Sequence, residues 1–349
     1  MASPSGISRI LQIHATRRCN LRCSHCYSVS GPEERTELEP GLLANAIRAA
    51  KENGFNVVGF SGGEPLMYKG LPQVLDAARD CGMVATLTSN GMLLNKKNVD
   101  MLKGRVNLIA ISIDGKPASH NKIRHHPRAF SKMKENLENL REAQIPFGFI
   151  FTLTQHNLHE LEWIAEFAIE QGAGLLQIHP LEDIGRARDE MKQQAPDDLE
   201  AAYAFVEVAR LQAMAGDKIT FQIDVIDRDY LKKNPDRVFA EAVNDRFDDG
   251  PFAEIVSPMI IEDDGRVSPI AYGFARQWEF GNLHEKPLQK MLDDWRGEKA
   301  PLFRKMCRNV LQDVVKEKRE WPFFNWYSAL EAEAEKIGAV YPLTRSVSV

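Results

Sequence analysis

Hydrophobic and polar positions alternate in a regular way from about residue 8 to residue 215. Short apolar or β-branched runs are each followed by a longer stretch in which apolar residues recur at i, i+3, i+4 and i+7. This pattern is typical of βα units that build a parallel sheet. Six strands are predicted, at 7–14, 56–61, 83–89, 107–114, 146–154 and 175–180.

The longer stretches are predicted to be amphipathic helices. Several end at a glycine, such as Gly54 or Gly82, and glycine is common just past the last helical residue. Because six units are too few to close an eight-stranded barrel, we expect an α/β fold built on a partly open (β/α)6 barrel. The predicted helices lie at 41–53, 71–81, 95–103, 129–143, 158–171 and 197–215.

The alternation weakens after about residue 216. A short strand is expected at 219–224, and a hairpin is expected with Asp264 and Gly265 at its turn. We therefore predict two domains, a barrel core over 1–215 and a smaller α+β module over 216–349. Three helices are expected in this module, near 284–295, 301–319 and 326–336.

Composition and charge exclude several classes of partner. The chain is 44% hydrophobic and 27% charged with a net charge of -5, and it contains no long Lys/Arg block that would attract nucleic acid or anionic lipid. The first ten residues lack a basic region followed by an apolar stretch, and no apolar run is long enough to cross a bilayer. We expect a cytoplasmic protein with no nucleic-acid or membrane partner.

Three of the five cysteines lie within eight positions, as Cys19-Asn-Leu-Arg-Cys23-Ser-His-Cys26, directly after the first predicted strand. This crowding does not resemble a disulfide framework. Thiolates select iron-sulfur clusters and zinc, and three of them can hold three irons of a cubane while the fourth iron stays open. The alternative is a structural zinc site with His25 or His14 as the fourth ligand.

Polar and glycine-containing segments also follow the next three predicted strands. They are Ser61-Gly-Gly-Glu-Pro65, Thr88-Ser-Asn-Gly91 and Ser112-Ile-Asp-Gly115. Each segment alone favours only a turn. Together with the cysteine triplet they resemble the radical S-adenosylmethionine (SAM) superfamily, in the expected order over roughly residues 7 to 190.

The resemblance implies one 4Fe-4S cluster on the three cysteines, with SAM bound at the open iron. It implies that the first of the three strand-end segments, Ser61-Gly-Gly-Glu-Pro65, holds the methionyl ammonium and that the other two serve the ribose and carboxylate. The residues concerned are Gly62, Gly63, Glu64, Ser89, Asn90, Ser112 and Asp114. It further implies reductive cleavage of SAM to a 5′-deoxyadenosyl radical that abstracts hydrogen from a substrate, with an electron donor such as flavodoxin or ferredoxin.

Four further residues are candidates through the same resemblance. His25 and Tyr27 flank the last cysteine, where the family contacts adenine. Arg124 ends a stretch similar to the family's HDxxRG and is a candidate for the cofactor carboxylate, against the alternative of a surface charge. His179, at the end of the sixth predicted strand, is a candidate pocket residue, against the alternative of a structural histidine.

The C-terminal module resembles a SPASM or twitch scaffold over residues 257–270 and 281–283. Ser257 and Ile270 stand where that scaffold usually has cysteines, so we expect no auxiliary cluster. Cys81 and Cys307 are predicted to be small buried apolar residues. Tyr272 is expected to pack or to face the cavity.

The SPASM-like module favours a ribosomally made peptide as substrate, for cross-linking or epimerisation. A small-molecule dehydrogenase, mutase or decarboxylase is the runner-up, because no peptide-binding domain is recognisable before residue 7. A non-catalytic iron-sulfur or zinc binding protein is the alternative from another class.

Overall fold

The computed structural model describes residues 8–234, 250–316 and 322–340. Its main sheet has ten strands in the order β11-β10-β9-β1-β2-β3-β4-β5-β6-β7. Strands β1 to β6 pair in parallel in chain order, which confirms the α/β prediction. Their bounds are β1 Ile10–His14, β2 Val57–Ser61, β3 Val84–Ser89, β4 Leu108–Ile113, β5 Phe147–Leu153 and β6 Leu175–Pro180.

Side-chain alternation along these strands separates the core from the site. In β4, Ile109, Ile111 and Ile113 are fully buried, whereas Ser112 lines a cavity on the other face. Successive strand residues point to opposite faces of a sheet, so one face packs on the helices and the other faces inward. The alternation therefore supplies a rigid apolar layer and a row of polar groups at the strand ends.

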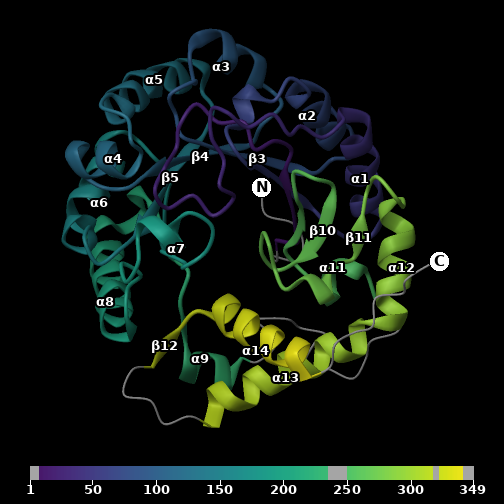
Figure 1. Cartoon of the computed structure of the whole chain (residues 1–349). Coiled ribbons are helices and arrows are strands. Elements are labelled where there is room, and N and C mark those ends of the chain that lie inside the picture. Colours follow the sequence, from purple (N-terminus) through teal and green to yellow (C-terminus); the bar gives the residue numbers. More distant parts are fainter. Residues whose placement is uncertain (1–7, 235–249, 317–321, 341–349) are drawn as a thin grey trace.

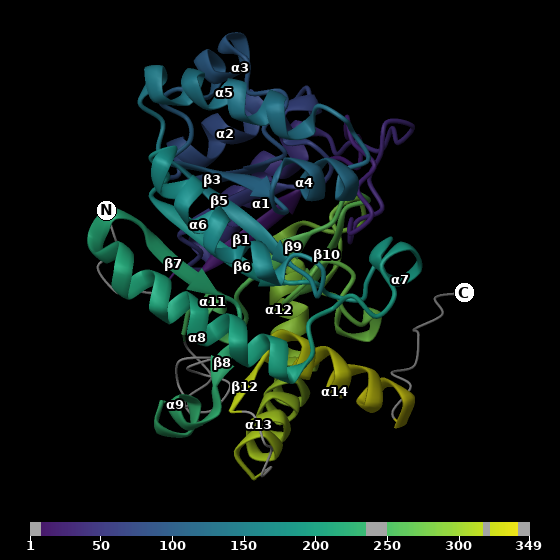
Figure 2. The same cartoon turned by 90° about the vertical axis from the view of Figure 1, so that its left-hand side faces the viewer.

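The helices lie on the outer side of the curved sheet (Figure 1). Figure 2 shows α6 and α8 outside β6 and β7, in agreement with their contacts. A helix at 117–123 was not predicted; it begins at a proline, whose fixed φ suits the first helical turn. The bounds are α1 Pro40–Glu52, α2 Leu71–Asp80, α3 Lys96–Leu102, α4 Pro117–Ile123, α5 Ala129–Ala143, α6 Leu161–Glu170, α7 Ala187–Glu190 and α8 Asp198–Ala215.

Strands from the predicted C-terminal module extend both ends of the parallel sheet. β7 (Thr220–Ile223) pairs in parallel with β6, and β9 (Met259–Ile261) pairs in parallel with β1. The predicted hairpin is confirmed, since β10 (Arg266–Pro269) runs antiparallel to β9 and Gly265 adopts a φ of +87° in its turn. The division at residue 215 stays a prediction.

The remaining C-terminal elements span the distance between the two ends of the sheet (Figure 1). α12 packs against α1, α13 against α9, and β12 pairs with β8. α12 begins at Leu288, later than predicted, because residues 283–286 form a turn and bend after β11. The bounds are β8 Ile226–Asp227, α9 Arg228–Lys233, α11 Phe252–Ile255, β11 Gly281–Asn282, α12 Leu288–Glu298, α13 Ala300–Lys316, β12 Phe323–Phe324 and α14 Trp326–Val340.

Residues 317–319 of one predicted helix lie outside the described residues. Cys307 is fully buried on α13, as predicted, and Cys81 packs half-buried against the core at the end of α2. Among the described helices, none is long and apolar enough to cross a membrane.

Candidate active site

A cavity of about 440 Å³ lies at the carboxyl ends of the parallel strands, which is where barrel active sites form. It brings together most of the residues that the sequence analysis singled out. Glu64 and Asp114 do not line it and lie buried behind its wall. The predicted residues that line it are Cys19, Cys23, His25, Cys26, Tyr27, Gly62, Gly63, Ser89, Asn90, Ser112, Arg124 and His179.

The three cysteines form one side of this cavity. Cys19 and Cys23 are each 8% exposed and pack with Leu21, and Cys26 and Met92 pack against them. Burial raises the pKa of Cys19 to about 12 and the pKa of Cys23 to about 11. Thiols with such raised pKa values stay protonated at pH 7 unless a cation stabilises the thiolate form. A coordinating metal supplies that cation and deprotonates its thiol ligands outright.

The donor set fits an iron-sulfur cubane. In the described part of the chain, no three His, Cys, Asp or Glu side chains form a ready-made group around a single metal ion. A cubane held by three cysteines does not need such a group, since each thiolate binds a different iron. Hydrogen bonds to the sulfurs, such as that from Ser30 N to Cys26 Sγ at 3.3 Å, are of the kind that tune cluster potentials.

Arg186 clamps the cysteine loop from the far side of the barrel, a role that the sequence analysis missed. Its buried guanidinium donates from Nη1 to the Cys23 carbonyl at 2.6 Å and from Nη2 to the Ser30 carbonyl at 2.8 Å. Its backbone N–H donates to the Cys26 carbonyl at 2.9 Å. The only signal for this role in the sequence was an arginine that directly follows Gly185 after the sixth predicted strand.

Gly62 and Gly63 let two loops of the site touch. A Cβ atom on Gly62 would lie 2.6 Å from the Thr16 carbonyl oxygen, and one on Gly63 would overlap the Arg18 carbonyl oxygen. The N–H of Gly63 donates to Thr16 at 2.7 Å and that of Glu64 donates to Arg18 at 2.9 Å. Glycine is required here because only a bare backbone fits the approach.

Glu64 is buried behind the cavity wall and is not among the residues that line the cavity. The side chain is 0% exposed and accepts hydrogen bonds from Ser89 Oγ and Asn90 N, both at 2.9 Å. Burial raises the pKa of Glu64, and these donors oppose that shift. Glu64 therefore fixes the end of β3, so that Asn90 lies beside Cys19.

Asp114 is likewise not a lining residue, and it organises its neighbours instead. It accepts from Arg124 Nε at 2.5 Å and Nη2 at 3.2 Å, and its Oδ1 lies 3.0 Å from His25 Nε2. Burial favours a raised pKa for Asp114, but Arg124, His25 and His120 hold it well below its usual value. Arg124 is only 5% exposed, so the surface-charge alternative is wrong.

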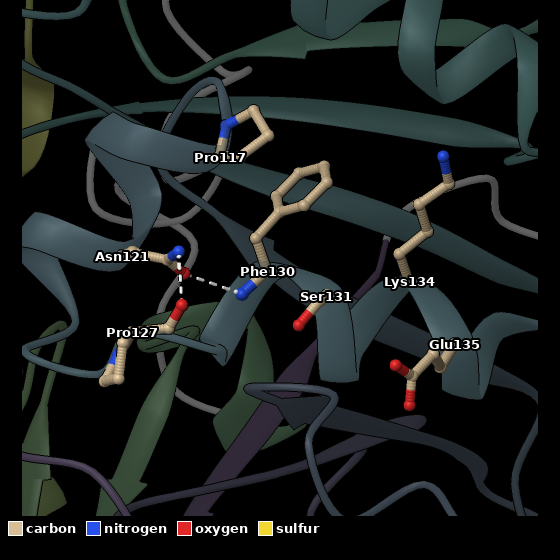
Figure 3. A pocket seen from close by; sticks show the side chains of 7 residues that line it. All are labelled: Pro117, Asn121, Pro127, Phe130, Ser131, Lys134 and Glu135. Atoms are coloured by element: carbon tan, nitrogen blue, oxygen red, sulfur yellow. Dashed lines mark hydrogen bonds between the residues drawn. The ribbon is translucent and has the colours of Figure 1, made fainter.

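The corner that follows Arg124 is shown in Figure 3. Asn121 Nδ2 donates to the Pro127 carbonyl at 2.8 Å, and Phe130 N donates to Asn121 Oδ1 at 2.9 Å. These bonds tie the end of α4 to the start of α5 beside a shallow hollow on the outside of the barrel. Arg124 lies within the segment 121–130 that these bonds close.

Another part of the cavity wall carries aromatic and acidic groups, of which Glu182 and Asp224 had no role in the sequence analysis. The rings of His14, Tyr27 and Tyr272 contact one another with centroid separations of 4.8 to 5.6 Å. Tyr272, expected to pack or to face the cavity, does both, and it donates to Asp263 Oδ1 at 2.6 Å. His179 lies 2.9 Å from Asp224, on the strand ends β6 and β7.

Known proteins resemble this chain over most of its length. It is 27% identical to the Fe-coproporphyrin III synthase of Methanosarcina barkeri over 81% of the chain and 73% of that protein. It is 32% identical to the AdoMet-dependent heme synthase of the same organism, over 57% and 58%. The sporulation killing factor maturation protein SkfB of Bacillus subtilis is 28% identical, over 53% and 45%. The chain thus spans between about half and three quarters of these relatives.

Solved structures share the fold. Streptococcus suis SuiB bound to S-adenosylmethionine has a TM-score of 0.64 at 17% identity, covering 90% of this chain and 69% of SuiB. The description "Radical SAM superfamily" matches residues 13–168, which hold the cysteine triplet and the polar ends of strands β2 to β4. Residues 13–168 therefore form a Radical SAM domain, and the predictions of an enzyme, of a 4Fe-4S cluster and of S-adenosylmethionine as cofactors are confirmed.

Proposed function

We propose that this radical SAM enzyme abstracts hydrogen from a ribosomally made peptide, leading to cross-linking or epimerisation. When bound, the cluster and S-adenosylmethionine supply the 5′-deoxyadenosyl radical for that abstraction. Cys19, Cys23 and Cys26 would hold the cluster, and the backbone around Gly62 and Gly63 would receive the methionyl end of the cofactor. Reduced flavodoxin or ferredoxin is the proposed electron donor.

The remaining predicted residues are proposed to contact the cofactor directly or to position a residue that does. Glu64 and Asp114 act through Asn90 and Arg124, which face the cavity in their place. Ser89 and Ser112 are proposed for the ribose, and His25 and Tyr27 for adenine. A cytoplasmic location suits free thiols, which persist in a reducing compartment.

The sign of charge in the cavity is the observation that carries the peptide proposal. Glu182 and Asp224 line it, and Arg124 is its one Arg or Lys among the described residues. That guanidinium is already paired with Asp114. A negative wall without a free cation repels a substrate with several carboxylates and attracts a neutral or cationic one, such as a peptide segment.

Tetrapyrrole chemistry is the second candidate, because Fe-coproporphyrin III synthase matches 81% of the chain. It belongs to the runner-up class, a small-molecule decarboxylase or dehydrogenase. Substrates of that kind carry several propionate groups, which need cationic partners in a binding site. The peptide proposal is favoured because this cavity offers such groups no free cation in the described residues. SuiB, of the same fold, has been solved with its precursor peptide SuiA.

Two substrates separate the candidates in one experiment. The anaerobically reconstituted enzyme is incubated with S-adenosylmethionine, dithionite and either a short peptide encoded beside its gene or Fe-coproporphyrin III. Fe-coproporphyrin III becomes heme when two of its propionates are decarboxylated, so it tests the likeness to the AdoMet-dependent heme synthase. Mass spectrometry of the peptide, incubated in D2O, is expected to show loss of two hydrogens on cross-linking or replacement of one hydrogen by deuterium on epimerisation, while the tetrapyrrole is recovered unchanged. Decarboxylated tetrapyrrole with an unmodified peptide would reverse the assignment.

A further inference from the structure

Three polar side chains, Gln177, His179 and Asp224, cluster on the cavity wall formed by the ends of β6 and β7. Gln177 Nε2 donates to Asp224 Oδ2 at 2.9 Å, and His179 Nδ1 lies 2.9 Å from the same oxygen. The backbone N–H of Asp224 donates to the Ile178 carbonyl at 3.0 Å. Asp224 is thus held by the sheet and by Gln177, and it in turn orients the imidazole of His179.

This orientation leaves the second ring nitrogen of His179 for the cavity. A carboxylate on Nδ1 keeps the proton there, so that Nε2 carries the free lone pair. The nearest carboxylate to Nε2 is Glu182 Oε1 at 3.9 Å, too far for a direct hydrogen bond. The side chain is 37% exposed, and it lines the cavity. A structural histidine would be enclosed with both nitrogens satisfied.

The surrounding charges set the proton affinity of the ring. Burial lowers the pKa of His179, but Asp224 and Glu182 outweigh it and raise the pKa above its usual value. Tyr327 and Glu331 of α14 face the same acidic group, with Tyr327 beside Asp224 and Glu331 beside Glu182. Burial and Glu182 raise the pKa of Glu331 to about 7. A histidine between carboxylates can take up and release a proton near neutral pH.

We propose that His179 is a catalytic proton-transfer residue of this site and that Asp224 is its positioning residue. The substrate group that it serves is a neutral or cationic proton donor, such as an amide, ammonium, hydroxyl or thiol. In the step, the lone pair of Nε2 forms an N–H bond as the X–H bond of that group breaks, and the electron pair of X–H stays on X. The imidazolium then releases the proton to water, and no oxidant is needed for this step. The inference rests on the proposed function, which supplies the substrate.

The test compares the complete reconstituted chain with three variants. His179→Gln removes the proton acceptor, Asp224→Asn removes the positioning charge, and His159→Gln is the matched control. His159 also lies beside a carboxylate, 3.8 Å from Glu160, but outside the cavity. The substrate is whichever of the neighbouring peptide and Fe-coproporphyrin III the wild-type enzyme converts.

His179→Gln is expected to slow product formation by about 100-fold or more, and His159→Gln to leave it unchanged. Since the base form is active, the rate rises with pH through the pKa of His179. Asp224→Asn is expected to move that limb to lower pH by about one unit. An unaltered rate in His179→Gln, or an unmoved limb in Asp224→Asn, would overturn the proposal.

A second readout keeps this inference separate from the proposed function. The titration midpoint of the His179 ring, followed by nuclear magnetic resonance and identified by its loss in His179→Gln, requires no substrate. It is expected to lie above the usual value for a histidine, because Asp224 and Glu182 raise the pKa of His179, and to fall by about one unit in Asp224→Asn. Failure to convert either substrate then rejects the proposed function, whereas an unmoved midpoint rejects the His179–Asp224 pair.

Discussion

Replacing Asp114 by Asn tests the buried charge group behind the cavity wall. The carboxylate accepts from Arg124 at 2.5 and 3.2 Å and contacts His25 at 3.0 Å, all within the interior. Asn has nearly the same volume, so the substitution removes charge and leaves the packing in place. The guanidinium of Arg124 is then buried without a counter-charge.

Removing one partner of a buried ion pair costs about 3–5 kcal/mol, because the remaining charge stays desolvated. His120 does not replace the lost charge. Its Nδ1 accepts the Asp114 N–H at 3.2 Å, and burial lowers its pKa to about 3, so its ring is neutral at pH 7. We therefore expect Asp114→Asn to lower the free energy of unfolding by about 3–5 kcal/mol.

The assay is urea unfolding of the reduced, metal-free chain at pH 7, followed by circular dichroism. Wild type and variant are compared at a common m value. Glu254→Gln is the control, because its partly exposed pair with Arg9 at 2.6 Å contributes about 1 kcal/mol or less. A loss below about 1 kcal/mol in Asp114→Asn would show that Arg124 finds another partner or water, and the reasoning would be refuted.

Three further predictions follow from buried contacts. Arg186→Gln should lower the free energy of unfolding by about 2–3 kcal/mol and speed the loss of iron to a chelator, because the two charged hydrogen bonds of Arg186 hold the cysteine loop. The exposed Arg188→Gln is the control, and equal rates of iron release in the two variants would contradict this prediction. Burial lowers the pKa of His14 to about 3, so below pH 6.5 the unfolded chain binds a proton that the folded chain does not. The stability of wild type relative to His14→Phe should therefore fall by about 1.4 kcal/mol per pH unit from pH 6 to 3, and parallel urea curves would refute it. Gly63→Ala should cost about 1–3 kcal/mol or more in urea unfolding, because its Cβ overlaps the Arg18 carbonyl oxygen, whereas Gly174→Ala, with no atom nearer than 4.0 Å, should not.

Local sequence patterns predicted the repeated part of the fold well. Each βα unit carries its own strand run, helical period and glycine stop, so its elements follow from short-range information. The predicted strand 107–114 is β4 (Leu108–Ile113), for example, and its Ser112, predicted to bind the cofactor, lines the cavity. Predicted residues of the cysteine triplet and of the strand-end segments also lie together around one cavity.

Long-range pairing was beyond the sequence. Nothing local shows that Met259–Ile261 continues the sheet beside β1, a pairing that joins Leu11 to Met259. The inward or outward direction of Glu64 and Asp114 was also not predictable, because both follow strands whose alternation ends at the loop. Their buried partners Ser89 and Arg124 decided it.

The site contacts that the sequence did not reveal are also long-range contacts. His179 was named from its strand end, but its partner Asp224 lies 45 positions later, after β7. Arg186 reaches Cys23 across 163 positions. Such contacts exist only once the barrel has curved.

The central claim is that Cys19, Cys23 and Cys26 hold a cluster that cleaves S-adenosylmethionine. The most direct measurement is 5′-deoxyadenosine released by the anaerobically reconstituted chain with dithionite, alongside its iron content, in wild type and in the three Cys→Ala variants. We expect close to four irons per chain and release of the nucleoside in wild type, and loss of both in each variant, whereas Cys81→Ala keeps both. Stoichiometric zinc without any 5′-deoxyadenosine, or full release in the Cys→Ala variants, would contradict the account.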